Sequence, residues 1–450
     1  MNIHFISIGG SIMHNLAIAL HKKGYKVTGS DDEIFEPAKS RLDKYGLLPR
    51  KTGWDESKIT SDTDAIILGM HAKDDNPEMK KAMALGLKIY SFPEFMYENN
   101  KNKKRIVIAG SHGKTTITAM VMHALSKLGY DFDYMVGSGI AGFEDSVRLS
   151  ENAPWIIMEG DEYLTSALDK KPKFLWYKPE VALISGIAWD HMNVFPTYDI
   201  YMQQFLDFMN SMPEKASLVY CNQDNDLVNL VAKCPHLKRI PYGMPEFRLV
   251  NNKFSLISGS EEIPLNVFGS HNLMNIEGAA LVCNELGIDK NDFFHAISDF
   301  KGAGKRLEVV LENDKLIAFR DFAHAPSKVK ATIEGIRIQY PDRKVIACLE
   351  LHTYSSLNKD FLPQYKHSAD KADEMFIYIN PEEVKLKRLE ELDSEKIKIS
   401  FGRTDVKVFF DLEELKTEMK KLNYNNSILL IMSSGSFNGW DIKDFFNKLS

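Results

Sequence analysis

Short apolar runs recur along the chain and alternate with longer stretches whose apolar residues repeat every three or four positions. In the first hundred residues, the runs "NIHFISI", "KVTGSD", "DAIILG" and "LKIYS" lie at 2–8, 26–31, 64–69 and 87–91. We interpret these runs as strands of a mainly parallel sheet and the stretches between them as covering helices. The polar, basic segment "NNKNKKR" at 99–105 has the composition of a linker. We therefore predict a first, Rossmann-like domain over residues 1–103.

The same alternation continues to the end of the chain. The runs "WIIM", "VALISGI" and "SLVYC" lie at 155–158, 181–187 and 217–221, and the glycines of "KGAGKRLE" at 301–308 indicate a second hinge. Beyond that hinge, further runs follow at 315–321, 344–351, 375–380, 407–410 and 427–434. The pattern predicts an α/β protein of three domains in series. The central domain, 104–303, would hold a P-loop-like parallel sheet, and 304–450 a second Rossmann-like domain.

The first strand and helix carry glycines suited to a phosphate. Gly9 and Gly10 follow the first strand, and Asp31 comes about twenty residues later, at the end of the second, as in a dinucleotide-binding βαβ unit. Ser7 and Ile12 stand where the dinucleotide fingerprint has glycines, so an NAD-dependent dehydrogenase is disfavoured. The N–H groups after the strand would still lie at a helix start, where they attract a diphosphate.

The segment "IVIAGSHGKTTITAM" at 106–120 resembles a phosphate-binding loop with one altered position. The usual G-x-x-x-x-G-K-[ST] string has a glycine where this chain has Ile108. A buried strand precedes the loop and an amphipathic helix follows it, so the loop lies where backbone N–H groups and the helix dipole attract phosphate. Lys114 would reach the β- and γ-phosphates, and Thr115 would offer its hydroxyl to Mg²⁺. The alternative is a glycine-rich turn with an exposed lysine. The residues predicted to bind ATP here are Gly110, Ser111, His112, Gly113, Lys114, Thr115 and Thr116.

Acidic and imidazole groups follow two other strands of the same domain. "WIIMEGDE" supplies Glu159, Asp161 and Glu162, and "ISGIAWDHMN" supplies Asp190 and His191. Ligands collect beyond the carboxyl ends of parallel strands, so we expect these groups to face the same phosphate cavity as the loop. Carboxylate oxygens suit Mg²⁺. Taken one at a time, either segment is more typical of a solvated loop.

Composition narrows the classes of function. The chain has 450 residues, 44% of them hydrophobic and 26% charged, with a net charge of −6, which argues against a nucleic-acid partner. The four cysteines have no metal-type spacing and favour a reducing compartment. No basic leader with an apolar stretch opens the chain, and no apolar run reaches about 18 residues. We expect a cytoplasmic protein with no membrane span.

At this point the sequence resembles the Mur ligases, which make or repair the peptide stem of bacterial cell-wall precursors. The string "AGSHGKTT" is similar to their A-G-[TS]-x-G-K-T loop. Members of that family lack the first glycine of the usual string, and in this chain Ile108 occupies that position. The resemblance implies ATP and two Mg²⁺ ions, one held by Thr115 and Glu159 and the second by His191.

Further strings extend the resemblance over nearly the whole chain. "FGSHNLMN" is similar to the family's H-N-x-x-N and implies that His271, Asn272 and Asn275 lie near adenine. "GKRLE" implies that Arg306 reaches the ATP phosphates, and "RDFAHAPSK" implies Asp321 at the ribose. Lys114, His191 and Arg306 would be the catalytic residues. The UDP-sugar site would comprise Gly9, Gly10, Ser11, Ile12, Asp31 and His71.

Other strings bear on the branch of the family. The helix predicted after His191 has no lysine before Lys215, which disfavours the branches that carry a carbamoylated lysine there. Segments 30–37, 76–95, 168–179 and 431–440 resemble the branch that attaches a recycled tripeptide. We therefore predict an ADP-forming ligase that joins UDP-N-acetylmuramate to L-Ala-γ-D-Glu-meso-diaminopimelate through an acyl phosphate, in peptidoglycan recycling. The alternative is the ligase that adds L-alanine in peptidoglycan synthesis.

The residues expected to meet the peptide are His324, His352, Thr353 and Ser434. Two departures affect this expectation. Ala325 replaces the second of the family's paired histidines, and "ELHTYSSLN" at 350–358 lacks an arginine that the tripeptide branch carries. A bidentate guanidinium has no equivalent in His352 or Thr353. The third peptide residue, the general base and the oligomeric state stay open, as does a nucleotide-gated binding protein without chemistry.

Overall fold

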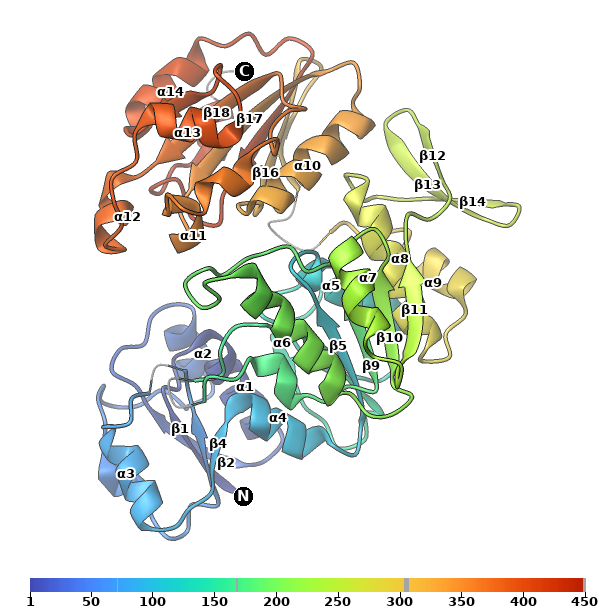
Figure 1. Cartoon of the computed structure of the whole chain (residues 1–450). Helices are drawn as coiled ribbons and strands as arrows, with labels where there is room; N and C mark the ends of the chain where they lie inside the picture. Colours follow the sequence, from blue (N-terminus) through green and yellow to red (C-terminus); the bar gives the residue numbers. More distant parts are fainter. Residues whose placement is uncertain (71, 167–168, 303–306, 448–450) are drawn as a thin grey trace. The chain divides into compact units, whose positions relative to one another are not determined.

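The computed structural model describes residues 1–70, 72–166, 169–302 and 307–447 (Figure 1). The chain divides into two compact units. The first unit comprises Met1–Ile187, Met202–Gly243 and Gly278–Lys290, and the second comprises Ala188–Tyr201, Met244–Glu277 and Asn291–Ser450. Among the described residues, no helix is long and apolar enough to cross a membrane.

The amino-terminal part of the first unit is a parallel sheet in the order β2-β1-β3-β4. Its strands are β1 (Asn2–Ile6), β2 (Lys26–Ser30), β3 (Ala65–Leu68) and β4 (Ile89–Ser91), and its helices are α1 (Ser11–Lys22), α2 (Ala38–Lys44), α3 (Pro77–Ala84) and α4 (Phe92–Asn100). Strands β1 and β3 are almost wholly buried because helices cover the sheet. Asn76 and Ser91 cap the amino termini of α3 and α4, which is why these helices begin where they do.

The central sheet of the first unit has the order β11-β10-β9-β5-β8-β6-β7 (Figure 1). Its strands are β5 (Lys104–Ala109), β6 (Asp133–Met135), β7 (Val147–Arg148), β8 (Trp155–Glu159), β9 (Val181–Ile184), β10 (Ser217–Cys221) and β11 (Lys238–Tyr242). All neighbours pair in parallel except β6 and β7. Strand β5 lies between β9 and β8, so the loop that follows β5 emerges in the middle of the carboxyl edge. Helices α5 (Lys114–Lys127), α7 (Asn225–Ala232) and α8 (His271–Asn284) follow β5, β10 and β14 along the chain.

The second unit holds two sheets. The smaller is antiparallel, with β12 (Phe247–Val250), β13 (Lys253–Ser258) and β14 (Glu261–Pro264). The larger has the order β15-β16-β20-β17-β18-β19, from β15 (Glu308–Glu312), β16 (Leu316–Asp321), β17 (Lys344–Leu351), β18 (Glu374–Ile379), β19 (Lys407–Phe409) and β20 (Ser427–Met432). Apolar cores lie on both of its faces, and α10 (Pro326–Gln339) packs in the core on one of them. The other helices of the carboxy-terminal part are α11 (Tyr354–Leu357), α12 (Pro381–Leu386), α13 (Ser394–Phe401), α14 (Leu412–Lys420) and α15 (Ile442–Asn447). Two more helices lie earlier in the chain, α6 (Tyr198–Ser211) and α9 (Lys290–Ile297).

Each apolar run interpreted as a strand is a strand of one of these sheets. The antiparallel sheet was not predicted. Asn251 and Asn252 join its first two strands with φ angles of 49° and 59°, the left-handed geometry of a tight hairpin. The sequence signal was two adjacent asparagines between two apolar-polar runs, because asparagine tolerates the left-handed geometry that such a turn requires.

Within the first unit, the loop before β7 binds the two helices of the amino-terminal domain. Asp145 accepts hydrogen bonds from Lys22 Nζ and Arg41 Nη2, both at 2.5 Å, and its side chain is 13% exposed. Nearby, Lys44 pairs with Glu144 at 3.0 Å, but both of those side chains are mostly exposed. One shielded carboxylate therefore holds α1 and α2 against the central domain.

We expect Asp145→Asn to loosen this contact by about 1–2 kcal/mol, because it leaves two cations without their shared anion. Hydrogen exchange followed by mass spectrometry should become faster in α1 and α2. The matched control is Glu144→Gln, which breaks an exposed pair and should leave exchange nearly unchanged. Equal exchange in both variants would contradict this role for Asp145.

Candidate active site

The altered position of the phosphate-loop string is explained by the strand before it. Ile108 is fully buried in β5 and lies opposite Glu159 of β8 and Leu183 of β9. The chain turns one residue after the strand, at Gly110, which has a φ of 116°. A Cβ atom at Gly110 would lie 2.7 Å from the backbone nitrogen of Ser185, so a side chain there is excluded. The glycine that this loop requires is therefore at 110 and not at 108.

The loop is fastened to the end of β9. Ser111 N donates to Gly186 O at 2.9 Å, and the Ser185 hydroxyl donates to the carbonyl oxygen of His112. Gly113, with a φ of 69°, is the residue before α5 and directs Lys114 and Thr115 into the first turn of that helix. The predicted strand, loop and helix are confirmed, and hydrogen bonds to the residues after β9 hold the loop backbone.

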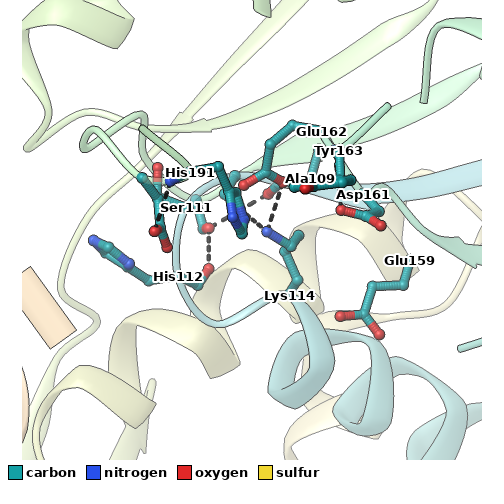
Figure 2. A network of polar contacts seen from close by, with 12 residues as sticks. Ala109, Ser111, His112, Lys114, Glu159, Asp161, Glu162, Tyr163 and His191 are labelled. Carbon is teal, nitrogen blue, oxygen red and sulfur yellow. Dashed lines mark hydrogen bonds and ion pairs between the residues drawn. The ribbon is translucent and has the colours of Figure 1, made fainter. Parts of the chain in front are cut away.

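Lys114 places a positive charge at the carboxyl edge of the central sheet (Figure 2). Its Nζ donates to Gly110 O at 2.6 Å and to Glu162 Oε2 at 2.8 Å. The Glu162 side chain is 1% exposed and that of Lys114 is 17% exposed. Burial opposes the charge of Lys114, but the carboxylates of Glu162, Asp161 and Glu159 outweigh it and raise the pKa of Lys114. The lysine is therefore a shielded, fully charged group, and the alternative of an exposed lysine on a glycine turn is wrong.

Glu159, the last residue of β8, and the two acids that follow it have three different partners. Glu159 accepts from the Thr115 hydroxyl at 2.7 Å and from Gly137 N at 3.0 Å. Asp161 pairs with Lys173 at 2.5 Å, and although burial opposes its charge, Lys173 lowers its pKa. Glu162 pairs with Lys114, as described above. The segment is thus an ordered wall of the site and not a solvated loop.

Thr115 and Glu159 fit the magnesium site that the sequence predicts. Both present oxygen atoms, the ligand type that Mg²⁺ prefers, and they are already in contact. Within the described ranges, no group of three or more His, Cys, Asp or Glu side chains could hold a metal by itself.

Asp190 and His191 belong to the second unit. Asp190 accepts from Lys328 Nζ at 3.1 Å and from the backbone N–H of His191 at 2.8 Å. Burial would raise the pKa of Asp190, but the charges of Lys328, His191 and His324 together lower it far below its usual value. His191 has a φ of 56°, a strained backbone that is frequent at functional sites. A phosphate cavity shared with Lys114 remains a prediction.

The residues predicted near the nucleotide base and ribose also lie in the second unit. Asn272 Nδ2 donates to Phe268 O at 2.7 Å, and Asn275 Nδ2 donates to Asn272 Oδ1 at 3.0 Å, so both are fixed in the first turns of α8, which begins at His271. Both oxygens of Asp321 are engaged within the unit, one by the Thr332 hydroxyl at 2.7 Å. Asp321 therefore has a structural role within the unit that the sequence did not predict.

The residues predicted to meet the peptide are held in different ways. His324 Nδ1 lies 2.8 Å from Phe322 O, and the His324 carbonyl accepts from the Tyr365 hydroxyl. The Thr353 hydroxyl accepts from Ser356 N at 3.1 Å and caps α11. The Ser434 hydroxyl is buried and makes no hydrogen bond within the described part of the chain. His352 lies beside Gly435, where an added Cβ would meet its ring.

The loop after β1 is bound by the acidic residue that follows β2. Gly9 N donates to Asp31 Oδ2 at 2.7 Å, so the aspartate at the end of β2 is bound to the loop. Gly10 precedes α1, which begins at Ser11 and continues through Ile12. Two predicted site residues, His71 and Arg306, lie outside the described residues. The predicted boundary between residues 303 and 304 lies outside them as well.

Three partners in the site were missed by sequence reasoning: Glu162 as counter-ion of Lys114, Lys173 as that of Asp161, and Lys328 as that of Asp190. Each pair joins residues far apart in sequence or on different elements, and spacing does not reveal it. For Lys328, the one available signal was its place in the string "HAPSK", two residues after a proline that begins a helix.

Comparisons with known proteins show what this chain is similar to. Residues 2–104, 108–283 and 305–435 match family models described as Mur ligase family, catalytic domain; Mur ligase middle domain; and Mur ligase, glutamate ligase domain. A UDP-N-acetylmuramate–L-alanine ligase of Sulfurihydrogenibium is 30% identical over 96% of this chain and 95% of its own. Two solved structures share the fold. A UDP-N-acetylmuramate–alanine ligase of Thermotoga maritima has a TM-score of 0.68 at 20% identity, covering 100% of this chain and 99% of its own. A murein peptide ligase of Psychrobacter arcticus has a TM-score of 0.64 at 22% identity, covering 100% and 98%.

The buried pair of Asp190 and Lys328 should stabilise the fold at neutral pH. We expect Asp190→Asn to lower the midpoint of thermal unfolding by about 5 °C at pH 7, because Lys328 loses its counter-ion. The pKa of Asp190 is lowered by folding, so its contribution is complete above the unfolded-state pKa of about 4 and declines as the pH falls below it. Calorimetry should show that the unfolding midpoints of the parent and the Asp190→Asn variant lie closer together at about pH 3 than at pH 7. A difference that is constant with pH would contradict the pairing.

Proposed function

The chain belongs to the Mur ligase family of ATP-dependent, ADP-forming ligases, with its three-domain α/β architecture, and we propose that it joins the carboxyl group of UDP-N-acetylmuramate to the amine of an L-alanyl unit. The observation that supports this proposal most directly is the shielded Lys114 ammonium at the carboxyl edge of the central sheet, beside Thr115 and Glu159. That arrangement suits the transfer of a phosphoryl group to a second anion.

The proposed reaction proceeds in two steps. A carboxylate oxygen of the muramate attacks the γ-phosphorus of ATP, which forms an acyl phosphate and releases ADP. The amine then attacks the acyl carbon, loses a proton and expels inorganic phosphate. The first step brings two anions together, so its barrier falls where positive charge is held ready. Lys114 would neutralise the β- and γ-phosphates, and ATP would take the place of Glu162 as its counter-ion.

Other groups of the chain would bind and orient the substrates. Thr115 and Glu159 would hold Mg²⁺, which supplies further positive charge to the phosphates. The loop at Gly9 and Gly10 would bind the diphosphate of the UDP-sugar at the start of α1. His324 Nδ1 lies within hydrogen-bond distance of a carbonyl oxygen, so the neutral form of this ring would carry its proton on Nδ1 and its lone pair on Nε2. In that form His324 could accept the proton of the attacking amine, and His191 is the second candidate for that task.

The amine donor is the finer part of the proposal. The curated relative at 30% identity is named as an L-alanine ligase, and this favours L-alanine over the tripeptide that the sequence predicts. The tripeptide remains a second candidate on a specific observation. The segments at 30–37, 76–95, 168–179 and 431–440 resemble the tripeptide branch. Both donors present the same L-alanyl amine, so the chemistry at the acyl phosphate is the same.

One assay tests the proposed function and separates the two donors. Phosphate release is measured with ATP and UDP-N-acetylmuramate, to which L-alanine, L-Ala-γ-D-Glu-meso-diaminopimelate or no amine is added. We expect release that depends on the muramate and on an amine, with L-alanine the better donor. Preference for the tripeptide would select the second candidate. Release that requires neither the muramate nor an amine would contradict the proposal altogether.

Lys114→Ala should lower kcat by at least about 100-fold, because removal of one preorganised charge from a transition state costs that much. The matched control is Lys127→Ala, at the exposed end of the same helix, which should keep ordinary turnover. Circular dichroism would verify that both variants fold. Ordinary turnover in the Lys114 variant would show that the loop is not the ATP site.

A further inference from the structure

Lys328 lies in the first turn of α10, where a cation is locally unfavourable. It is the third residue of this 14-residue helix, after Pro326 and Ser327, and no acidic residue lies in the same turn. The amino terminus of a helix carries partial positive charge, so acids stabilise it and a lysine destabilises it. Exceptions to such local rules are expected at functional sites. The place of Lys328 is therefore to be explained by what its side chain binds.

The side chain of Lys328 binds a carboxylate that lies 138 positions earlier in the sequence. Lys328 Nζ donates to Asp190 Oδ2 at 3.1 Å, and the other oxygen of Asp190 accepts from the backbone N–H of His191 at 2.8 Å. The side chains of Lys328 and Asp190 are 17% and 10% exposed, so solvent ions screen this pair only weakly. Through one carboxylate, Lys328 is therefore connected to the backbone of His191.

His324 lies on the helix side of this ion pair, because one residue separates it from the start of α10. Its Nδ1 is 2.8 Å from Phe322 O, and its carbonyl oxygen accepts from the Tyr365 hydroxyl. Tyr365 is fully buried in the apolar core of the second unit, and its ring stacks on Phe401 with centroids 4.9 Å apart. The backbone at His324 is therefore fixed to that core.

The loop on the other side of the ion pair packs against the same core through two uncharged contacts. The Trp189 ring meets Phe361 edge to face, with centroids 5.8 Å apart. The Met192 N–H donates to the Ser355 hydroxyl at 3.3 Å, a long hydrogen bond. Both partners lie in the segment 354–365, which also contains the tyrosine described above. The ion pair therefore joins two segments that are packed on one core, and it adds a charged contact between them.

We propose that Lys328 is a positioning residue, which through Asp190 fixes His191 relative to His324, the two imidazoles suited to accept the proton of the attacking amine. The inference rests on the proposed function and deepens it, because it assigns a role in the same reaction to a lysine outside the phosphate loop. A displacement of about 1 Å in a reacting group can cost about 100-fold in rate, so a contact that fixes two such groups affects turnover strongly. Lys328 itself forms and breaks no bond in this role.

The test is steady-state kinetics of amine-dependent phosphate release, with the better of the two amine donors. Lys328→Met keeps the aliphatic stem and removes the charge. We expect it to lower kcat at least about tenfold and to leave the KM for ATP within about twofold, because Lys328 is not among the groups predicted to bind ATP. Lys328→Arg keeps a cation that can bind the carboxylate and should retain kcat within about threefold of the parent. The matched control is Lys330→Met, an exposed lysine two positions later in the same helix, which should turn over as the parent does.

A double-mutant cycle separates this role from a contribution to stability alone. If Lys328 acts through Asp190, adding Lys328→Met to the Asp190→Asn variant should change kcat by less than about twofold, although each single variant lowers it. Thermal unfolding of the same variants gives the folded fraction at the assay temperature. An unchanged kcat in Lys328→Met, losses that multiply in the double variant, a loss in the arginine variant as large as in the methionine variant, or losses that only match the unfolded fraction would each overturn the inference. Failure of the proposed function is seen separately, as an absence of amine-dependent phosphate release from the unmodified protein.

Discussion

The charge of Lys114 at the carboxyl edge of the central sheet is the interaction on which the proposed chemistry depends. A shielded ammonium is stable only beside an anion, and here Glu162 Oε2 and Gly110 O hold it at 2.8 and 2.6 Å. The turn at Gly110 and the hydrogen bonds to the end of β9 fix the loop from which Lys114 projects. The protein therefore maintains a cation of fixed position, and a triphosphate can bind there by replacing one anionic partner with another. The buried strands of the sheet provide the rigidity that this exchange requires.

The fold was largely predictable from the sequence, because parallel strands that are buried on both faces have nearly continuous apolar sequences. The loop at 110–116 was predictable for the same reason, since its glycines and lysine stand between such a run and an amphipathic helix. The partners within the site were not. Glu162 is 48 positions from Lys114, and its pairing with that lysine follows from the order of β5 and β8 in the sheet. Likewise, Asp321 resembles a ligand residue in the sequence, yet its carboxylate bonds Thr332 of α10 in the structure.

Family membership and substrate choice depend on different parts of the molecule. The groups proposed to activate the carboxylate lie in the first unit, where the loop string and the oxygen ligands are those expected of a Mur ligase. The groups proposed to select the amine lie in the second unit. There the chain lacks a histidine at 325 and the arginine expected in 350–358. A guanidinium cannot be exchanged for a hydroxyl without changing what is recognised. The sequence similarity to L-alanine ligases is therefore stronger evidence for the type of reaction than for the identity of the amine donor.

The central claim is that the charged loop makes a carboxylate of the muramate accept phosphorus from ATP. The most direct measurement uses UDP-N-acetylmuramate labelled with ¹⁸O in its lactyl carboxyl group, with mass spectrometry of the phosphate released in the presence of the amine donor. Our account predicts one ¹⁸O atom in each phosphate, because the acyl–oxygen bond breaks when the amine displaces the phosphate. Phosphate that carries only solvent oxygen would show that ATP is hydrolysed by water, and the claim would be wrong.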